Sequence, residues 1–138
     1  MSIPKPQKYN SSKVKKRLRN KADKLFKQII ILRANSRCEV CGSVFGITAH
    51  HFFPRSIAGH MVFLIDNGVC LCRGCHFAHH FKSDPIIHQK IIALRGERWY
   101  HRLEKIKKEE HLSYKTIAWY RENIKRLESI YEKTLVAS

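Results

Sequence analysis

Metal-binding residue types crowd into one stretch of the chain, and no other feature limits the possible fold as much. Two Cys-x2-Cys pairs, Cys38/Cys41 and Cys72/Cys75, enclose a His-His pair at residues 50 and 51, and further histidines follow the second pair. Thiolates and imidazoles are preferred ligands of zinc and related ions in proteins. We therefore expect this chain of 138 residues to fold around metal as much as around a small apolar core.

The four paired cysteines are enough for a closed tetrahedral zinc site of the structural kind. The 30 residues between Cys41 and Cys72 exceed the spacing of the commonest zinc patterns, so the chain must return to its starting point. The polar, basic N-terminus has no signal-peptide pattern, and no apolar run approaches the length of a membrane span. We expect a cytoplasmic protein with reduced thiols, which favours zinc over disulfides. Cys70 is expected to be a buried thiol, with a swapped zinc ligand as the alternative.

The residues between and after the cysteine pairs predict a strand over 47–53, a connection over 55–66, a second strand over 68–71 and a helix over 74–82. Adjacent residues on a strand point to opposite sides, so His50 and His51 are not expected to bind the same ion. One of the two would bind metal, and the other would stay available as a base. His76 and His80 lie one helical turn apart and are candidates for the remaining ligands.

This combination of groups suits phosphodiester hydrolysis. A metal ion neutralises charge that develops on the phosphate and the leaving oxygen, while a base activates the attacking water. Asn67 is a candidate for holding the base imidazole in one tautomer, and Arg55 for pairing with the scissile phosphate. The other histidines are expected to be ordinary structural or surface residues: His60, His79, His88, His101 and His111.

Positive charge is unevenly distributed along the chain, whose formal net charge is +16. Residues 1–37 hold 12 Lys and Arg against the single acid Asp23, whereas residues 38–84 are neutral overall. Basic arms around a neutral metal-binding centre are typical of a protein that binds the phosphate backbone of nucleic acid. The plainer alternatives are a basic surface that only faces solvent and one that binds an anionic membrane. The residues predicted to contact DNA are Lys15, Lys16, Arg17, Arg19, Lys24 and Arg55.

Four further helices are expected outside the centre. The first runs from a cap at Ser11 or Ser12 to residue 34, and its apolar stripe consists of Val14, Leu18, Ala22, Leu25, Ile29 and Leu32. The others begin at Asp84, Glu97 and Ser113, with Trp99, Leu103 and Ile106 inward on the second and Ile117, Tyr120, Ile124, Leu127 and Tyr131 inward on the last. We expect three parts: a basic leader and helix (1–34), a metal-binding core (35–83) and a helical extension (84–138).

At these positions the chain resembles the HNH endonuclease family. The pattern consists of Cys38-x2-Cys41, Ala49-His50-His51, Pro54-Arg55-Ser56, Asp66-Asn67-Gly68 and Leu71-Cys72-x2-Cys75-His76-x3-His80. The resemblance covers roughly residues 25–105, and GERWYHRL at 96–103 is similar to phage-encoded members, including those similar to the NinG recombination proteins. It implies an α+β protein with a small ββα-metal core and a structural zinc knuckle of four cysteines. It also implies a bacterial host cell, with a phage genome as one candidate source.

The resemblance also implies roles for single residues. It implies that His51 is the general base, Asn67 the middle Asn and His76 the final His of the motif. His50 stands where many members have an Asp ligand, and colicin-type nucleases also have His there. An imidazole-rich site accepts Mn2+, Ni2+ or Zn2+, whereas an Asp-containing site favours Mg2+. We therefore expect a catalytic Mg2+ or Mn2+, with Ni2+ or Zn2+ as alternatives, and leave open whether His76, His80 or both bind it.

The expected partner is double-stranded or branched DNA, with no membrane partner, and the protein is either a monomer or a homodimer. The main alternative function is a non-catalytic zinc-knuckle protein that only binds nucleic acid, which leaves the histidines without a role. A zinc nucleotide deaminase is excluded because His50 lacks a Glu two residues on and no Pro-Cys precedes the second cysteine pair. A zinc finger with two Cys and two His is excluded because no paired histidines follow Cys41 at the usual distance.

Overall fold

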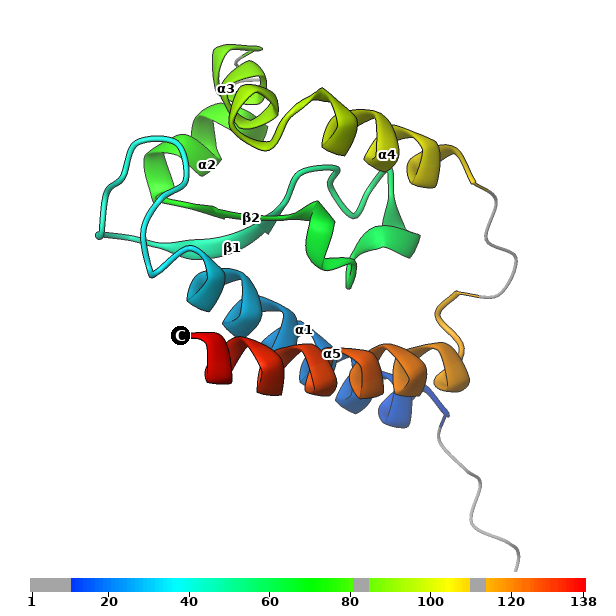
Figure 1. Ribbon diagram of the computed structural model, residues 1–138. Helices are drawn as coiled ribbons and strands as arrows, with labels where there is room; N and C mark the ends of the chain where they lie inside the picture. Colours follow the sequence, from blue (N-terminus) through cyan, green and yellow to red (C-terminus); the bar gives the residue numbers. More distant parts are fainter. Residues whose placement is uncertain (1–10, 81–84, 110–113) are drawn as a thin grey trace, which may run out of the picture.

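The computed structural model describes residues 11–80, 85–109 and 114–138, without the side chain of His80 (Figure 1). The predicted α+β class is confirmed: a two-stranded antiparallel sheet is surrounded by helices. The elements in chain order are α1 (Ser11–Arg33), β1 (Thr48–His51), the short 3-10 turns η1 (Gly59–Met61) and η2 (Ile65–Asn67), β2 (Gly68–Leu71), α2 (Arg73–His80), α3 (Pro85–Arg95), α4 (Glu97–Lys108) and α5 (Ile117–Ala137). None of the described helices combines the length and the hydrophobicity needed to cross a bilayer.

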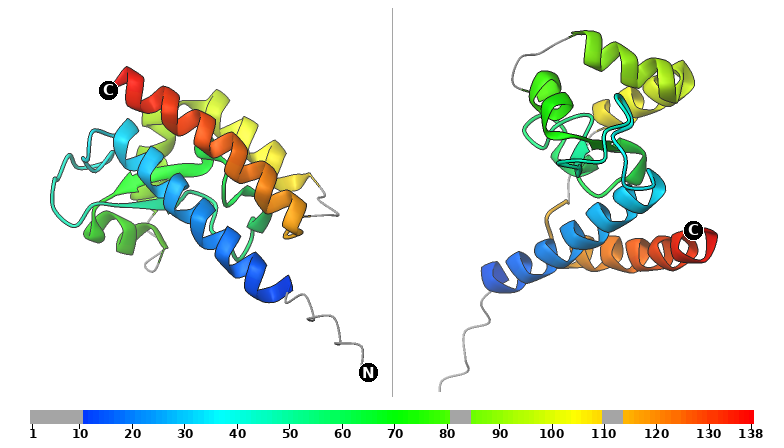
Figure 2. Two further views of the ribbon diagram at one scale, coloured as in Figure 1. Left: turned by 90° about the horizontal axis from the view of Figure 1, so that it is seen from below. Right: turned by 90° about the vertical axis from the view of Figure 1, so that its left-hand side faces the viewer.

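The sheet lies between two helical layers, with α1 and α5 on one side and α2, α3 and α4 on the other (Figures 1 and 2). Helices α1 and α5 come from opposite ends of the chain, yet they lie side by side and run in the same direction in all three views. Lys21 of α1 and Glu128 of α5 form an ion pair of 3.8 Å across this contact. The last helix is therefore packed on the first rather than on the helices that precede it.

Both faces of the sheet are buried, and two apolar clusters fill the spaces between the layers. Every residue of β2 is buried, and successive residues of a strand point to opposite faces. Cys70 accordingly joins the cluster under α1 and α5, whereas Val69 and Leu71 join the cluster under α3 and α4. A sheet of only two strands is marginal by itself, so burial of both faces accounts for much of its stability.

The buried face of α1 is wider than the predicted stripe. Ala22 and Ile29 are buried as expected, but Phe26 and Ile30 are buried with them, while Leu18 and Leu25 are only partly buried. The reason is that α1 packs against both α5 and the sheet, so one narrow stripe is not enough. The inward faces predicted for α4 and α5 are confirmed at their buried positions: Trp99, Leu103, Tyr120, Ile124 and Leu127.

Two predicted helix starts lie outside the described residues, at Asp84 and Ser113. Helix α5 begins later than predicted, because the hydroxyl of Thr116 accepts a hydrogen bond of 3.0 Å from the backbone N–H of Trp119 and caps the helix. The second strand has the predicted bounds, but β1 ends at His51 rather than at residue 53. Phe52 and Phe53 leave the strand and turn into the core, where both are buried.

A glycine at the start of β2 allows α1 to approach the sheet closely. Gly68 pairs with His51 across the sheet, and an added Cβ would lie 2.2 Å from Cδ1 of Ile30 and 3.0 Å from Cζ of Phe26. Both of those side chains are buried, so neither can swing out to make room. The position therefore requires glycine for space, since its φ of −91° suits any residue.

We predict that Gly68→Ala lowers the free energy of unfolding by about 1–3 kcal/mol, because the new methyl group overpacks the contact with α1. The measurement is urea unfolding followed by circular dichroism. Gly74→Ala is the matched control, since a Cβ there meets nothing within 4 Å and alanine favours a helix by about 0.5–1 kcal/mol. Equal stability of the Gly68→Ala variant and the unaltered protein would contradict this account of the packing.

Candidate active site and metal centre

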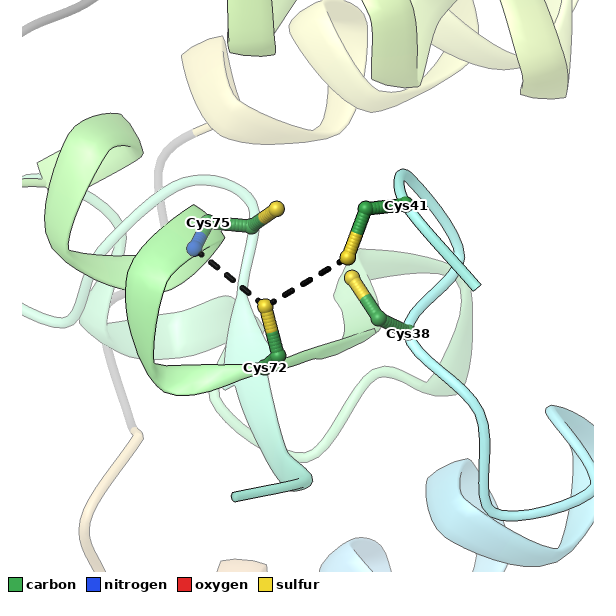
Figure 3. Close-up of side chains that lie close together, drawn as sticks. All are labelled: Cys38, Cys41, Cys72 and Cys75. Carbon is green, nitrogen blue, oxygen red and sulfur yellow. Dashed lines mark hydrogen bonds between the residues drawn. The ribbon is translucent and has the colours of Figure 1, made fainter. Parts of the chain in front are cut away.

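The four paired cysteines come together in space, as predicted (Figure 3). Cys38 and Cys41 lie in the turn after α1, Cys72 directly follows β2, and Cys75 lies in the first turn of α2. The four sulfur atoms all lie within 4.8 Å of one another, and the Cys41 and Cys72 sulfurs are 3.6 Å apart. Four sulfur ligands in a compact group are the donor set of a structural tetrahedral zinc site, so the cluster fits zinc.

Local backbone structure brings Cys38 and Cys41 together. Gly42 has a φ of 77°, a left-handed conformation, and its N–H donates to the carbonyl of Cys38 at 2.9 Å. Burial raises the pKa of Cys38, but backbone N–H groups of Cys41, Cys72 and Val40 outweigh it and lower the pKa to about 7. Part of the Cys38 population is therefore thiolate at neutral pH, the form that binds metal.

The fifth cysteine does not belong to this cluster, in agreement with the prediction of a buried thiol. Cys70 is fully buried in the apolar cluster between the sheet and α1. Burial raises its pKa to about 11, helped by the nearby carboxylate of Glu39. A protonated, buried thiol of this kind behaves as a small apolar residue.

Two histidines meet between the sheet and α2. The rings of His50 on β1 and His76 on α2 are stacked with centroids 3.4 Å apart and an angle of 10° between their planes. Nε2 of His50 also lies against the hydroxyl of Thr48. Among the described side chains, no third His, Cys, Asp or Glu completes a metal-binding group with this pair. His80 ends α2 one turn after His76, and its side chain lies outside the described part of the chain.

His51 faces α1, on the opposite side of the strand from His50, as expected for adjacent residues. Its ring stacks on Phe26 of α1, with centroids 4.9 Å apart, and its Nε2 lies 2.8 Å from the carbonyl oxygen of Val62. A carbonyl only accepts, so Nε2 carries the proton and Nδ1 of the neutral ring has a lone pair. Burial lowers the pKa of His51 below its ordinary value, which favours this neutral form.

Asn67 has a different partner from the one predicted. The structure places the carbonyl of Val62, and not the Asn67 amide, at the His51 ring. Asn67 is fully buried, where its Oδ1 accepts from the Phe53 N–H at 2.9 Å and its Nδ2 donates to the carbonyls of Phe53 and Met61 at 3.1 and 3.5 Å. The amide therefore fixes the connection between the strands, and this connection carries Val62. Asn67 thus acts on the His51 imidazole only indirectly.

Both histidines of β1 border one open hollow of about 420 Å³. Arg55 lines the same hollow and forms an ion pair of 3.4 Å with Asp23 of α1. The structure thus brings His50, His51 and Arg55 together around one hollow. Asp23 was not predicted as a site residue. The only feature of the sequence that distinguishes it is that it is the single acid among the first 37 residues.

Five of the six residues predicted to contact DNA lie along α1, and the sixth, Arg55, lies in the connection between the strands. Lys16, Arg17 and Lys24 are exposed, whereas Lys15 and Arg19 are partly buried. The remaining described histidines have structural contacts: His60 with the carbonyl of Ile106, His79 with the carbonyl of Phe52, His88 with the ring of Phe52, and His101 with Glu104. His111 lies outside the described residues.

We predict that the purified protein contains about one zinc ion per chain and that Cys72→Ser removes most of it, because a closed site needs all four ligands. The measurement is zinc content by mass spectrometry together with the thermal unfolding temperature, which should fall with the zinc. Cys70→Ala is the matched control and should retain zinc, since Cys70 is a cysteine outside the cluster. Full zinc content in Cys72→Ser would overturn the assignment.

Comparison with known proteins gives one match. A model of the HNH endonuclease family matches residues 38–82, which include both cysteine pairs, both strands and α2. No curated protein and no solved structure gave a significant match to the chain. The matched segment coincides with the cysteine cluster and the His50, His51 and His76 site. Residues 38–82 of the chain are thus similar to an HNH endonuclease domain.

Proposed function

We propose that the protein is a metal-dependent HNH endonuclease that hydrolyses phosphodiester bonds in DNA. The observation that carries the proposal is the hollow in which His50, His51 and Arg55 meet, inside the segment that matches the family. The hollow contains two imidazoles on one strand with different surroundings: one against a second imidazole, the other on a backbone carbonyl. Such a difference suits two roles, metal ligand and base.

His51 is the proposed general base. With the Nε2 proton directed at the Val62 carbonyl, Nδ1 accepts a proton from water as the water oxygen bonds to phosphorus. The bond between phosphorus and the leaving oxygen then breaks, and that oxygen takes a proton from solvent. The stacking contact with Phe26 limits rotation of the ring, which supports a fixed direction of attack.

His50 and His76 are the proposed ligands of the catalytic ion, with His80 as a third. A divalent ion bound there would supply neutralisation of charge on the phosphate and the leaving oxygen. The ligand set is rich in imidazole, so it accepts Mn2+, Ni2+ or Zn2+ in addition to Mg2+. Burial lowers the pKa of His76, helped by neighbouring His79, and a neutral imidazole is the form that binds metal.

Arg55 and Asn67 complete the proposed machinery. Arg55 is half-exposed at the rim of the hollow, and its ion pair with Asp23 holds the guanidinium beside the histidines. A guanidinium there suits the scissile phosphate, to which it donates two hydrogen bonds at once. Asn67 is a positioning residue, because its hydrogen bonds fasten the connection that brings Val62 to His51.

We predict that the protein nicks or cuts plasmid DNA when Mg2+ or Mn2+ is added and that His51→Ala lowers the rate at least about 100-fold, the usual contribution of a general base. Plasmid relaxation on agarose gels measures the rate, and gel shift without added ion measures binding. Binding should persist in the variant, because the basic residues of α1 remain.

The matched control is His101→Ala, which removes an exposed histidine far along the chain whose contact is with Glu104. This variant should cleave like the unaltered protein. Equal and negligible cleavage by His51→Ala and the unaltered protein across divalent ions, with DNA binding intact, would favour the alternative function of a non-catalytic zinc-knuckle protein.

A second prediction separates the metal ligand from the base. His50→Ala should raise the Mn2+ concentration needed for half-maximal cleavage at least about tenfold, because it removes an ion ligand. His51→Ala should lower the maximal rate and leave the half-maximal Mn2+ concentration near its normal value. The measurement is the cleavage rate as a function of Mn2+ concentration at constant zinc. The same Mn2+ dependence in both variants would contradict the division of roles.

A further inference from the structure

A second hollow of about 100 Å³ lies where the start of α5 meets α1 and the connection between the strands. Its charged lining consists of three cations: Arg19 of α1, Arg55 of the connection, and Lys115 just before α5. Its remaining lining includes the aromatic rings of Phe63, Trp119 and Tyr120, and no acidic side chain lines it among the described residues. Apart from Arg55 and the Val62 carbonyl, its lining residues take no part in the proposed cleavage chemistry.

The aromatic part of the hollow is held in place by its own contacts. The ring of Trp119 lies 5.0 Å from Tyr120, 5.4 Å from Phe63 and 5.9 Å from Tyr114. The backbone of the same residue is fixed by the cap at Thr116. Trp119 is partly exposed, so its indole is a rigid apolar surface that a ligand can reach.

This hollow adjoins the proposed active site. Arg55 lines both hollows. Val62 also lines the second hollow, while its carbonyl oxygen lies 2.8 Å from Nε2 of His51. The second hollow therefore lies beside the proposed site of cleavage.

We propose that the second hollow binds one unpaired nucleotide next to the scissile phosphate, with its phosphate at Arg19 and Lys115 and its base against Trp119. Cations beside a rigid aromatic ring match the two parts of a nucleotide, an anion and a flat ring. A base can lie flat against the indole only where it is not stacked between neighbours in a duplex, so the nucleotide is unpaired. The position of the nucleotide beside the cut rests on the proposed function.

The experiment follows tryptophan emission of the full chain while a short oligothymidylate is added without added divalent ion. The chain has two tryptophans, and Trp99 is buried in the other layer. The oligonucleotide should quench the emission of the unaltered protein, and the remaining emission of Trp119→Phe should stay constant. A blunt hairpin duplex with the same number of phosphates should quench much less.

Arg19→Ala should raise the dissociation constant about tenfold, the effect of one charge-assisted hydrogen bond. Arg33→Ala is the matched control, because Arg33 is exposed on the same helix, about 21 Å from Arg19 at 1.5 Å per residue. It should change the constant less than about twofold, because salt screens charges at this distance. Absence of quenching, equal quenching by the duplex, or equal effects of the two arginine variants would each overturn the proposal.

The readout separates this proposal from the proposed function, since binding is measured without cleavage. If the protein cleaves DNA but the oligonucleotide does not change its Trp119 emission, only the proposed site for an unpaired nucleotide is refuted. A protein that is quenched as expected but cleaves nothing with any divalent ion refutes the nuclease, and the hollow then remains a single-strand binding site.

Discussion

Closure of the cysteine cluster is the constraint on which the rest of the structure depends. The strands β1 and β2 contribute only four residues each, too few to form a stable sheet alone. The cluster joins the turn after α1 to the end of β2 and so fixes both ends of the segment that contains the sheet. Glu39, between the two cysteines of the first pair, adds a second tie: its carboxylate accepts from the N–H of Cys70 and pairs with Arg95. This contact also covers the outer edge of β2, which is otherwise open to another strand.

Charge is distributed to match this division between scaffold and site. The metal-binding centre is neutral overall, whereas residues 1–37 have a net charge of +11. Because the centre is neutral, the electrostatic field there comes mainly from the ion and its ligands. The basic residues of α1 attract the phosphate backbone, whatever the base sequence. Arg55 is the exception, a cation at the histidines, and Asp23 offsets it when no phosphate is present. Binding is thus expected to weaken steeply with salt.

The local features of the fold were predictable from the sequence, and the long-range ones were not. Residues 68–71 are apolar and begin at the Gly of Asn67-Gly68, and each cysteine pair is a short local motif, so the second strand and the zinc ligands were predictable from neighbouring residues. The packing of α5 on α1 joins residues more than 100 positions apart, such as Lys21 and Glu128, and has no local signal. The same holds for the His51 contact with Val62, since a backbone carbonyl at this site depends on the path of residues 52–67 and not on a residue type.

The register of β1 links Asn67 to the proposed chemistry. Because adjacent strand residues face opposite layers, a slip of one residue would exchange His50 and His51 between α2 and α1. Asn67 opposes such a slip from the position just before β2: its carbonyl accepts from Phe52, and its side chain bonds to both backbone groups of Phe53. Gly68 then faces His51 and leaves the space in which Phe26 of α1 meets that ring. A buried amide that bonds only to backbone thereby determines which imidazole meets α2 and which meets the Val62 carbonyl, without touching either ring.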